Sequence, residues 1–125
     1  MTVAPPAPRR VLLVDDAEDL RTLLHIKLDR SDELVVVGEA EDGIDAVEQA
    51  ARLQPDLVLL DVSMPRMDGL EALPLIREAV PGVRVVVLSG FNEATMARNA
   101  LAAGAEHYVV KGAPLGELVE LLESL

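Results

Sequence analysis

Residues 57–69 read LVLLDVSMPRMDG, four apolar residues followed by Asp61 and then by a more polar stretch. A short apolar run without alternation is typical of a strand that is buried on both faces of a parallel sheet. Pro65 and Gly69 are turn formers, so a loop should follow this run. The segment therefore predicts a buried strand with an aspartate at its carboxyl end.

Four further apolar runs have the same character, at residues 11–14, 34–37, 83–88 and 108–110. Successive runs begin 23 to 26 residues apart, which leaves room for one strand, one helix and two short loops. Strands that alternate with helices in this way predict an α/β fold, with a parallel sheet, helices on both faces and right-handed crossovers.

The stretches between the runs predict amphipathic helices. Their expected shared faces are Leu20, Leu23, Leu24 and Leu28 in the first helix, Ile44, Val47 and Ala51 in the second, and Ala94, Ala97 and Leu101 in the fourth. Gly104 suits a left-handed cap after the fourth helix, and Pro114 suits the first turn of a fifth. Pro74 should kink the third helix or delay its start.

The composition excludes several classes of protein. The 125 residues carry a net charge of −11 and include no cysteine, no tryptophan, one tyrosine and one phenylalanine. Disulfide frameworks and cysteine-ligated metals are therefore excluded, and direct nucleic acid binding is disfavoured because phosphate contacts need a basic face. No apolar run approaches the roughly 20 residues that span a membrane. We expect a soluble domain over residues 10–125, preceded by a flexible proline-rich leader at residues 1–9.

Residues that carry chemistry follow four of the five predicted strands. Asp15 and Asp16 follow the first, Asp61 the third, Ser89 the fourth and Lys111 the fifth. The carboxyl ends of parallel strands meet at one edge, where open α/β sheets bind their ligands. Clustered carboxylates repel one another unless a divalent cation lies among them, and Mg²⁺ prefers such hard oxygen ligands. The sequence therefore predicts a Mg²⁺ site at this edge.

These motifs together resemble the receiver domain of two-component response regulators. The matching segments are VLLVDD at residues 11–16, LVLLDVSMPRMDG at 57–69, VVVLSG at 85–90 and HYVVKG at 107–112. The resemblance covers essentially everything after the leader. It implies the flavodoxin-like (βα)5 fold, a doubly wound five-stranded parallel sheet of order 2-1-3-4-5.

The resemblance also implies a role for each site residue. Asp61 is expected to accept a phosphoryl group from a sensor histidine kinase or phosphotransfer protein. Mg²⁺ is expected to bind Asp16, Asp61 and the backbone carbonyl of Ser63 directly, and Asp15 through water. Ser89, Lys111 and Tyr108 are the expected phosphate-contacting and switch residues. Ser63 and Phe91 are expected to flank the path of the water that hydrolyses the acyl phosphate.

Each of these residues also has an ordinary structural explanation. An acidic pair after a strand is commonly a loop and helix cap, a lone aspartate a turn residue, and a lysine a solvated charge. Ser89 can be a small residue at a strand end, and Tyr108 can simply fill the core. Their joint placement on one edge favours the site over these separate explanations. We assign no role to His25 or His107.

The glycine after Lys111 departs from the family, which commonly has proline there in a cis bond. A cis bond before a residue other than proline costs about 3–4 kcal/mol, so we expect a trans Lys111–Gly112 bond. Glycine is free to take a positive φ, which would let the lysine still reach the site.

The leading functional hypothesis is a phosphorylatable signalling switch. The alternative is a Mg²⁺-dependent phosphohydrolase with an aspartate nucleophile. Enzymes of the haloacid dehalogenase type, however, need a second carboxylate two residues after that aspartate, where this chain has Ser63. A flavin carrier would need aromatic residues to sandwich the flavin ring, and the chain has too few.

The resemblance implies a cytoplasmic protein that regulates a partner through the face of its fourth helix, fifth strand and fifth helix. GEAEDG at residues 38–43 and the glycine after Lys111 are similar to receivers attached to helix-turn-helix DNA-binding domains. A DNA-binding output domain outside this chain and a phosphorylation-dependent homodimer are therefore further expectations.

Overall fold

The structure, a computed structural model, describes residues 7–90 and 94–125. Within these residues five strands alternate with five helices. The strands are β1 (Arg9–Val14), β2 (Leu34–Ala40), β3 (Leu57–Asp61), β4 (Arg84–Ser89) and β5 (His107–Val110). The helices are α1 (Glu18–Asp29), α2 (Gly43–Leu53), α3 (Gly69–Ala79), α4 (Ala94–Ala102) and α5 (Leu115–Ser124).

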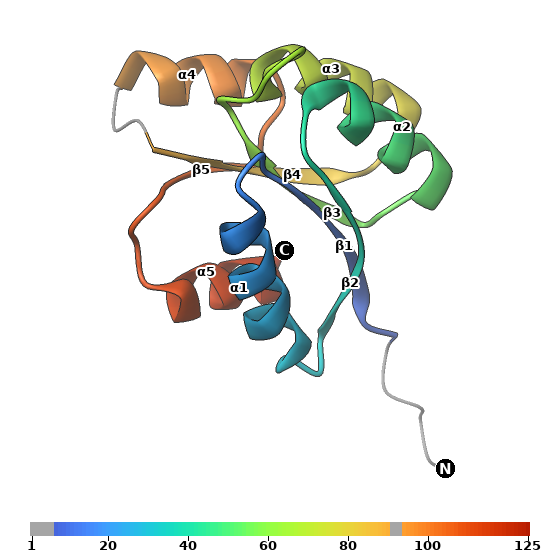
Figure 1. Cartoon of the computed structure of the whole chain (residues 1–125), viewed down its shortest axis with the longest axis vertical. Helices are drawn as coiled ribbons and strands as arrows, with labels where there is room; N and C mark the ends of the chain where they lie inside the picture. Colours follow the sequence, from blue (N-terminus) through green and yellow to red (C-terminus); the bar gives the residue numbers. More distant parts are fainter. Residues whose placement is uncertain (1–6, 91–93) are drawn as a thin grey trace.

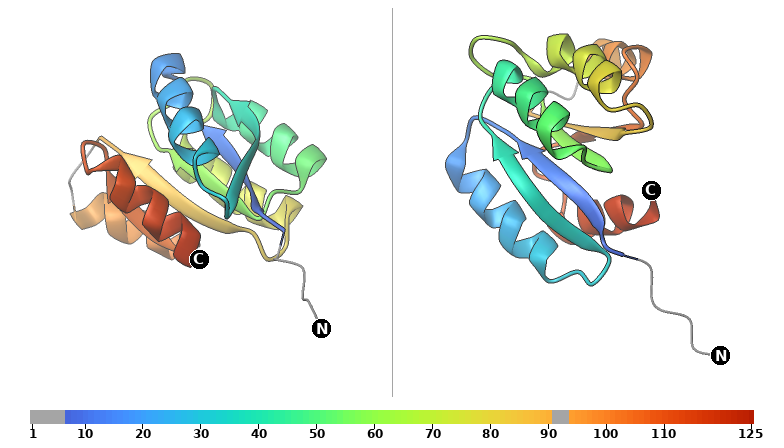
Figure 2. Two further views of the ribbon diagram at one scale, coloured as in Figure 1. Left: turned by 90° about the horizontal axis from the view of Figure 1, so that it is seen from below. Right: turned by 90° about the vertical axis from the view of Figure 1, so that its right-hand side faces the viewer.

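The strands form one parallel sheet in the order β2-β1-β3-β4-β5, which confirms the predicted topology. Helices α1 and α5 cover one face, and α2, α3 and α4 cover the other (Figures 1 and 2). The result is a three-layer arrangement with the carboxyl ends of β1 and β3 side by side. No helix in the described ranges is long and apolar enough to cross a membrane.

The sheet separates two apolar cores, and β3 contributes to both. Val58 and Leu60 pack in the core under α2, α3 and α4, whereas Leu57 and Leu59 pack in the core under α1 and α5. All four side chains are at most 2% exposed. A central strand with both faces covered has no polar side, which is why its sequence shows no alternation.

Strand β2 differs from the prediction of a strand buried on both faces. Only its end residues, Leu34 and Ala40, are buried, and Val35 is 38% exposed. The reason is position, because β2 is an edge strand with a neighbour on one side only. The pairing of β1 with β2 also shifts register between Val11 and Leu12, which leaves Val37 unpaired in a bulge.

The predicted face of the second helix is only partly right, because Ile44 and Val47 are half-buried and Val47 packs against the core under α2, α3 and α4. Helix α2 buries Gly43, Ala46 and Ala50, whereas Ala51 is exposed. Close packing explains this, because a side chain at position 43 would lie 2.4 Å from the backbone oxygen of Met67. The side of α2 that packs against the core therefore carries small residues, and larger residues lie at its flanks.

Two other helices also leave predicted apolar positions exposed. Leu23 of α1 is 44% exposed and Leu101 of α4 is 49% exposed. Helix α1 does bury Leu24 and Leu28, as predicted, whereas α4 buries Ala100 in place of Leu101. Apolar spacing therefore identified most of the buried face of α1 but not the buried position of α4.

The helix ends follow the predicted residues with one correction at proline. Gly104 has a φ of +110°, which confirms the left-handed position after α4. Pro114 directly precedes α5 and does not lie within its first turn. Pro74 lies inside α3 without delaying its start, because Asp68 and Glu71 form a capping box that begins the helix at Gly69.

Candidate functional site

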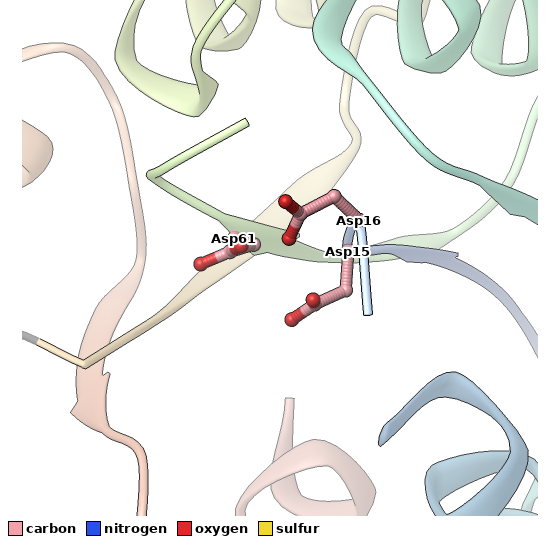
Figure 3. A group of neighbouring side chains, drawn as sticks. All are labelled: Asp15, Asp16 and Asp61. Atoms are coloured by element: carbon pink, nitrogen blue, oxygen red, sulfur yellow. The ribbon is translucent and has the colours of Figure 1, made fainter. Parts of the chain in front are cut away.

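Three carboxylates gather at the carboxyl ends of β1 and β3. Each of Asp15, Asp16 and Asp61 offers one oxygen, and these oxygens all lie within 4.8 Å of one another (Figure 3). Asp15 and Asp61 are each 3% exposed, whereas Asp16 is exposed. The sequence predicts this cluster, and the adjacency of β1 and β3 in the sheet produces it.

Lys111 bridges two of these carboxylates. Its Nζ lies 2.9 Å from Oδ2 of Asp15 and 3.2 Å from Oδ1 of Asp61. The backbone N–H of Lys111 donates to the carbonyl oxygen of Ser89 at 2.6 Å, which anchors the residue to the end of β4. The Lys111–Gly112 bond is trans and Gly112 has a φ of +100°, so both expectations for this loop are confirmed.

Strand alternation explains why these three side chains meet. Residues 11 and 13 of β1, 57 and 59 of β3, and 109 of β5 all pack on the side of the sheet covered by α1 and α5. Asp15, Asp61 and Lys111 continue that alternation by one further step of two residues. Three separate strands thus deliver two carboxylates and an ammonium group to the same side of one edge.

Burial and charge change the acidity of this cluster. Burial raises the pKa of Asp61 most, the charge of Asp15 raises it further, and the ion pair with Lys111 only partly offsets them. For Lys111, burial acts to lower the pKa, but the hydrogen bond to Asp15 and the charges of Asp61 and Asp15 outweigh it and raise the pKa. The site therefore holds more negative charge than its single ammonium group neutralises.

The raised pKa of Asp61 makes stability depend on pH. The folded state binds the proton of the Asp61 carboxyl group more tightly than the unfolded chain does. The stability contributed by this protonation is therefore fully present below the ordinary pKa of 3.8. It is lost as pH rises through the higher folded pKa. The asparagine side chain carries no charge at pH 7, so it avoids this loss of stability. Asp61→Asn should therefore unfold at a higher urea concentration than wild type at pH 7 in EDTA. Urea titrations should show the difference shrinking as pH falls toward 4; a constant difference would contradict this account.

The loop after β3 is clamped to the start of α2 by an ion pair that the sequence does not predict. Arg66 donates from Nε and Nη2 to Oδ2 of Asp42 at 2.9 and 2.7 Å. The N–H of Asp45 lowers the pKa of Asp42 most; burial opposes this, and Arg66 adds to the lowering. Arg66 has a φ of +66°, a left-handed conformation that costs roughly 1–2 kcal/mol without glycine, and these bonds offset that cost. Asp42 precedes a helix as a cap should, but no local signal could have revealed its partner.

The remaining predicted residues lie around this edge. Ser63 is exposed, two residues after Asp61 in the clamped loop. Ser89 is fully buried at the end of β4, and Tyr108 is partly buried and packs against the core under α2, α3 and α4. Phe91 lies outside the described residues. His25 does make a specific contact, with Glu39 on β2.

The donor set fits a hard divalent cation. All three side chains of the cluster are carboxylates, and no histidine or cysteine of the described residues joins them. Oxygen-only ligands of this kind suit Mg²⁺ or Ca²⁺ and disfavour the softer metals. Two buried carboxylates and one exposed one also leave the group open on one side, as a site that admits a second reactant must be.

A doubly wound parallel sheet with an acidic cluster and a lysine at its carboxyl edge defines a class of α/β domains. Similarity to known proteins identifies the family within this class. Residues 11–123 match the response regulator receiver domain, so the chain belongs to that family of phosphoryl-accepting switches. It is 39% identical over 114 residues to the chemotaxis protein CheY of Listeria monocytogenes, covering 91% of this chain and 95% of CheY.

Other relatives are longer than this chain. The chain is 36% identical over 115 residues to the response regulator protein VraR of Staphylococcus saprophyticus, covering 92% of the chain but only 55% of VraR. Among solved structures, the signal receiver domain of the response regulator NarL from Mycobacterium tuberculosis has a TM-score of 0.89 at 33% identity. That similarity covers 95% of this chain and 96% of the other.

Proposed function

We propose that Asp61 is the phosphoacceptor of this receiver domain. The observation that carries the proposal is a buried carboxylate at a strand end, in ion-pair contact with Lys111 and within 4.8 Å of two further carboxylates. A carboxylate oxygen of Asp61 attacks the phosphorus of a phosphohistidine. The new O–P bond forms as the N–P bond breaks, and the electron pair returns to the imidazole nitrogen of the kinase or phosphotransfer protein.

Alignment and charge neutralisation supply most of the catalysis in phosphoryl transfer. Lys111 already contacts Asp61, so its ammonium group is placed to neutralise charge on the transferred group. Asp16, Asp61 and the backbone carbonyl of Ser63 would hold Mg²⁺ directly, and Asp15 would hold it through water. When bound, the cation neutralises phosphoryl oxygens and offsets the repulsion among the carboxylates.

Phosphorylation changes the charge that the surrounding residues experience. An aspartyl phosphate adds roughly two negative charges and new acceptor oxygens. We place Ser89 and Lys111 as the groups that hydrogen-bond and pair with it, and Tyr108 as the residue that changes position in response. The backbone N–H of Lys111 donates to the carbonyl oxygen of Ser89 at 2.6 Å, so a shift at the end of β4 also moves the residue after β5.

The output side of the proposal involves α4, β5 and α5. Leu101 is half-exposed on α4, whereas Leu118 of α5 is buried and cannot serve as a contact. We place the exchange with the sensor kinase in the cytoplasm, as the family implies. VraR is nearly twice as long as the matched segment, so an attached output domain is one readout of this switch. The resemblance to receivers attached to helix-turn-helix domains favours DNA binding for that domain, and a phosphorylation-dependent homodimer is a further readout.

Phosphoryl stoichiometry separates this switch from a Mg²⁺-dependent phosphohydrolase. With excess acetyl phosphate and Mg²⁺, intact-mass measurement should show one phosphoryl group per chain, and EDTA should reduce it to background. With p-nitrophenyl phosphate, phosphate release should stay below one equivalent per chain over the same period. Many turnovers per chain on that ester would instead support the hydrolase.

A further inference from the structure

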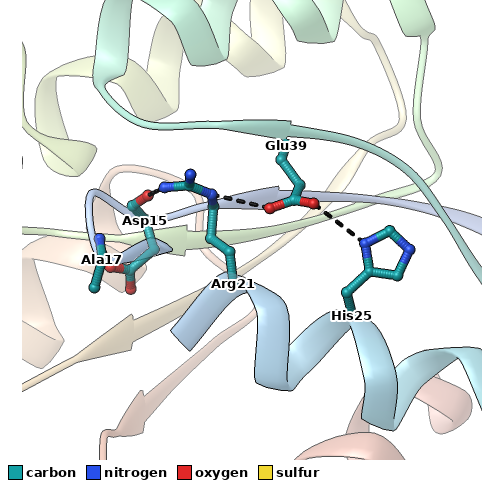
Figure 4. A network of polar contacts seen from close by, with 5 residues as sticks. All are labelled: Asp15, Ala17, Arg21, His25 and Glu39. Carbon is teal, nitrogen blue, oxygen red and sulfur yellow. Dashed lines mark hydrogen bonds and ion pairs between the residues drawn. The ribbon is translucent and has the colours of Figure 1, made fainter. Parts of the chain in front are cut away.

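Arg21, near the start of α1, joins the ends of two neighbouring strands. Its Nη1 donates to the main-chain carbonyl oxygen of Asp15 at 2.5 Å, and its Nε donates to Oε1 of Glu39 on β2 at 2.9 Å. The Arg21 side chain is only 13% exposed. Figure 4 shows the guanidinium group lying between the Asp15 turn and Glu39. One planar side chain thus contacts the β1–α1 turn and β2 at once.

The turn that carries Asp15 and Asp16 needs such a support. Ala17 occupies the cap position of α1 and has no side chain that could hold the helix start. Asp15 compensates in part, because its Oδ1 accepts from the N–H of Ala17 at 2.9 Å. Its own N–H donates to the carbonyl oxygen of Ala40 at 3.0 Å. Arg21 engages the remaining main-chain group of Asp15, its carbonyl oxygen.

Glu39 is itself held in place on its other side. Oε2 of Glu39 lies 3.2 Å from Nδ1 of His25, so both carboxylate oxygens have partners. Nε2 of His25 in turn lies 3.4 Å from Asp29, one helical turn further along α1. The guanidinium group of Arg21 is therefore oriented by a carboxylate that cannot swing freely.

We propose that Arg21 is a positioning residue for the cation site, acting through the main chain of Asp15, with Glu39 as the group that orients it. The proposal rests on the proposed function, in which Asp15 and Asp16 help to hold Mg²⁺. Arg21 touches neither the cation nor the phosphoryl group. Its effect is to fix the peptide unit between the two carboxylates, and so the angle at which both reach Asp61.

Electrostatics alone predicts the opposite effect of removing this arginine. Arg21 carries a positive charge close to an acidic cation site, so its loss should strengthen the attraction of that site for Mg²⁺. Loss of positioning should weaken Mg²⁺ binding, because groups that orient metal ligands commonly contribute 10–100-fold to metal affinity. The sign of the change therefore distinguishes the two explanations.

The first test measures Mg²⁺ dissociation constants by amide NMR titration of the full chain. Arg21→Ala should bind Mg²⁺ about tenfold more weakly than wild type. Arg21→Lys keeps the charge but loses the planar fork that reaches two acceptors, so it should show most of the same loss. Arg52→Ala, which makes the same charge change on α2, is the matched control and should bind as wild type does.

The second test uses two variants of Glu39 with identical charge changes. Glu39→Gln keeps an oxygen that accepts from Nε of Arg21, whereas Glu39→Ala removes it. Mg²⁺ affinity should therefore be well preserved in Glu39→Gln and clearly lower in Glu39→Ala. Equal affinities in this pair would overturn the orienting role of Glu39, and this comparison stands even if Arg21→Ala does not fold.

The outcomes separate this inference from the proposed function. Wild type that binds no Mg²⁺ would overturn both. Wild type that binds Mg²⁺, with unchanged or tighter binding in Arg21→Ala and Arg21→Lys, would overturn the positioning role and leave the proposed function standing. Urea titrations in EDTA identify any variant that has lost its fold, so that weak Mg²⁺ binding in a folded variant reports on the site itself.

Discussion

Asp61→Asn should abolish phosphoryl incorporation, while the fold remains intact. Wild type with excess acetyl phosphate and Mg²⁺ is expected to gain the mass of one phosphoryl group, and the variant none. The physical reason is that an amide oxygen is a far weaker nucleophile than a carboxylate and carries no charge for the cation or Lys111 to hold. Asn has nearly the shape of Asp, so packing around position 61 should change little.

Beryllofluoride offers an independent measurement of the same substitution. With Mg²⁺ it should bind wild type at Asp61 and shift amide resonances around the carboxyl edge of the sheet, and it should leave Asp61→Asn unchanged. Asp32→Asn, at an exposed aspartate between α1 and β2, is the matched control and should behave as wild type in both experiments. Phosphate on Asp61→Asn, or none on wild type under donor excess, would show that Asp61 is not the phosphoacceptor.

Gly69→Ala should be among the most destabilising single substitutions in this chain. A Cβ at position 69 would lie 2.0 Å from the carbonyl oxygen of Asp61, 2.9 Å from its carbonyl carbon and 3.0 Å from Cα of Val62. These are all backbone atoms, so no flexible side chain can move aside. Overpacking of this kind commonly costs 1–3 kcal/mol, and we expect about 3 kcal/mol or more here, measured by urea unfolding.

The same substitution should disturb the site. The N–H of Gly69 donates to the carbonyl oxygen of Val62 at 2.8 Å, so the start of α3 is tied to the residue after Asp61. Relief of the contact must shift either α3 or the end of β3, and phosphorylation by acetyl phosphate should slow accordingly. Gly116→Ala in α5, where nothing lies within 4 Å of an added Cβ, should instead gain about 0.5–1 kcal/mol. A Gly69→Ala protein as stable as wild type would contradict the close approach.

The sequence determined the strands and the residues at their carboxyl ends. Buried parallel strands must be apolar on both faces, so β1, β3 and β4 are visible as unbroken apolar runs. The spacing of these runs determines that each crossover holds a helix, and therefore that all strands run parallel. Asp15, Asp61 and Lys111 could be placed at one edge from this pattern, because a parallel sheet brings its carboxyl ends together.

Some local geometry was also predictable from residue type. The cost of a cis bond before glycine predicted the trans Lys111–Gly112 bond, the conformational freedom of glycine predicted the positive φ of Gly112, and both are observed. In contrast, the order of strands in the sheet came from the family resemblance. The strand order also determines burial, because it places β2 at an edge of the sheet, where the strand is only partly covered.

Only the tertiary structure decided which distant residues became partners. Arg66 pairs with Asp42 and Arg21 with Glu39, although 24 and 18 residues separate them along the chain. Tertiary packing also decided that α2 turns Ala46 and Ala50 inward. The physical reason is that periodicity gives only the spacing of apolar residues along the chain. Side-chain pairing depends on the distances between elements, and these are set when the helices pack onto the sheet.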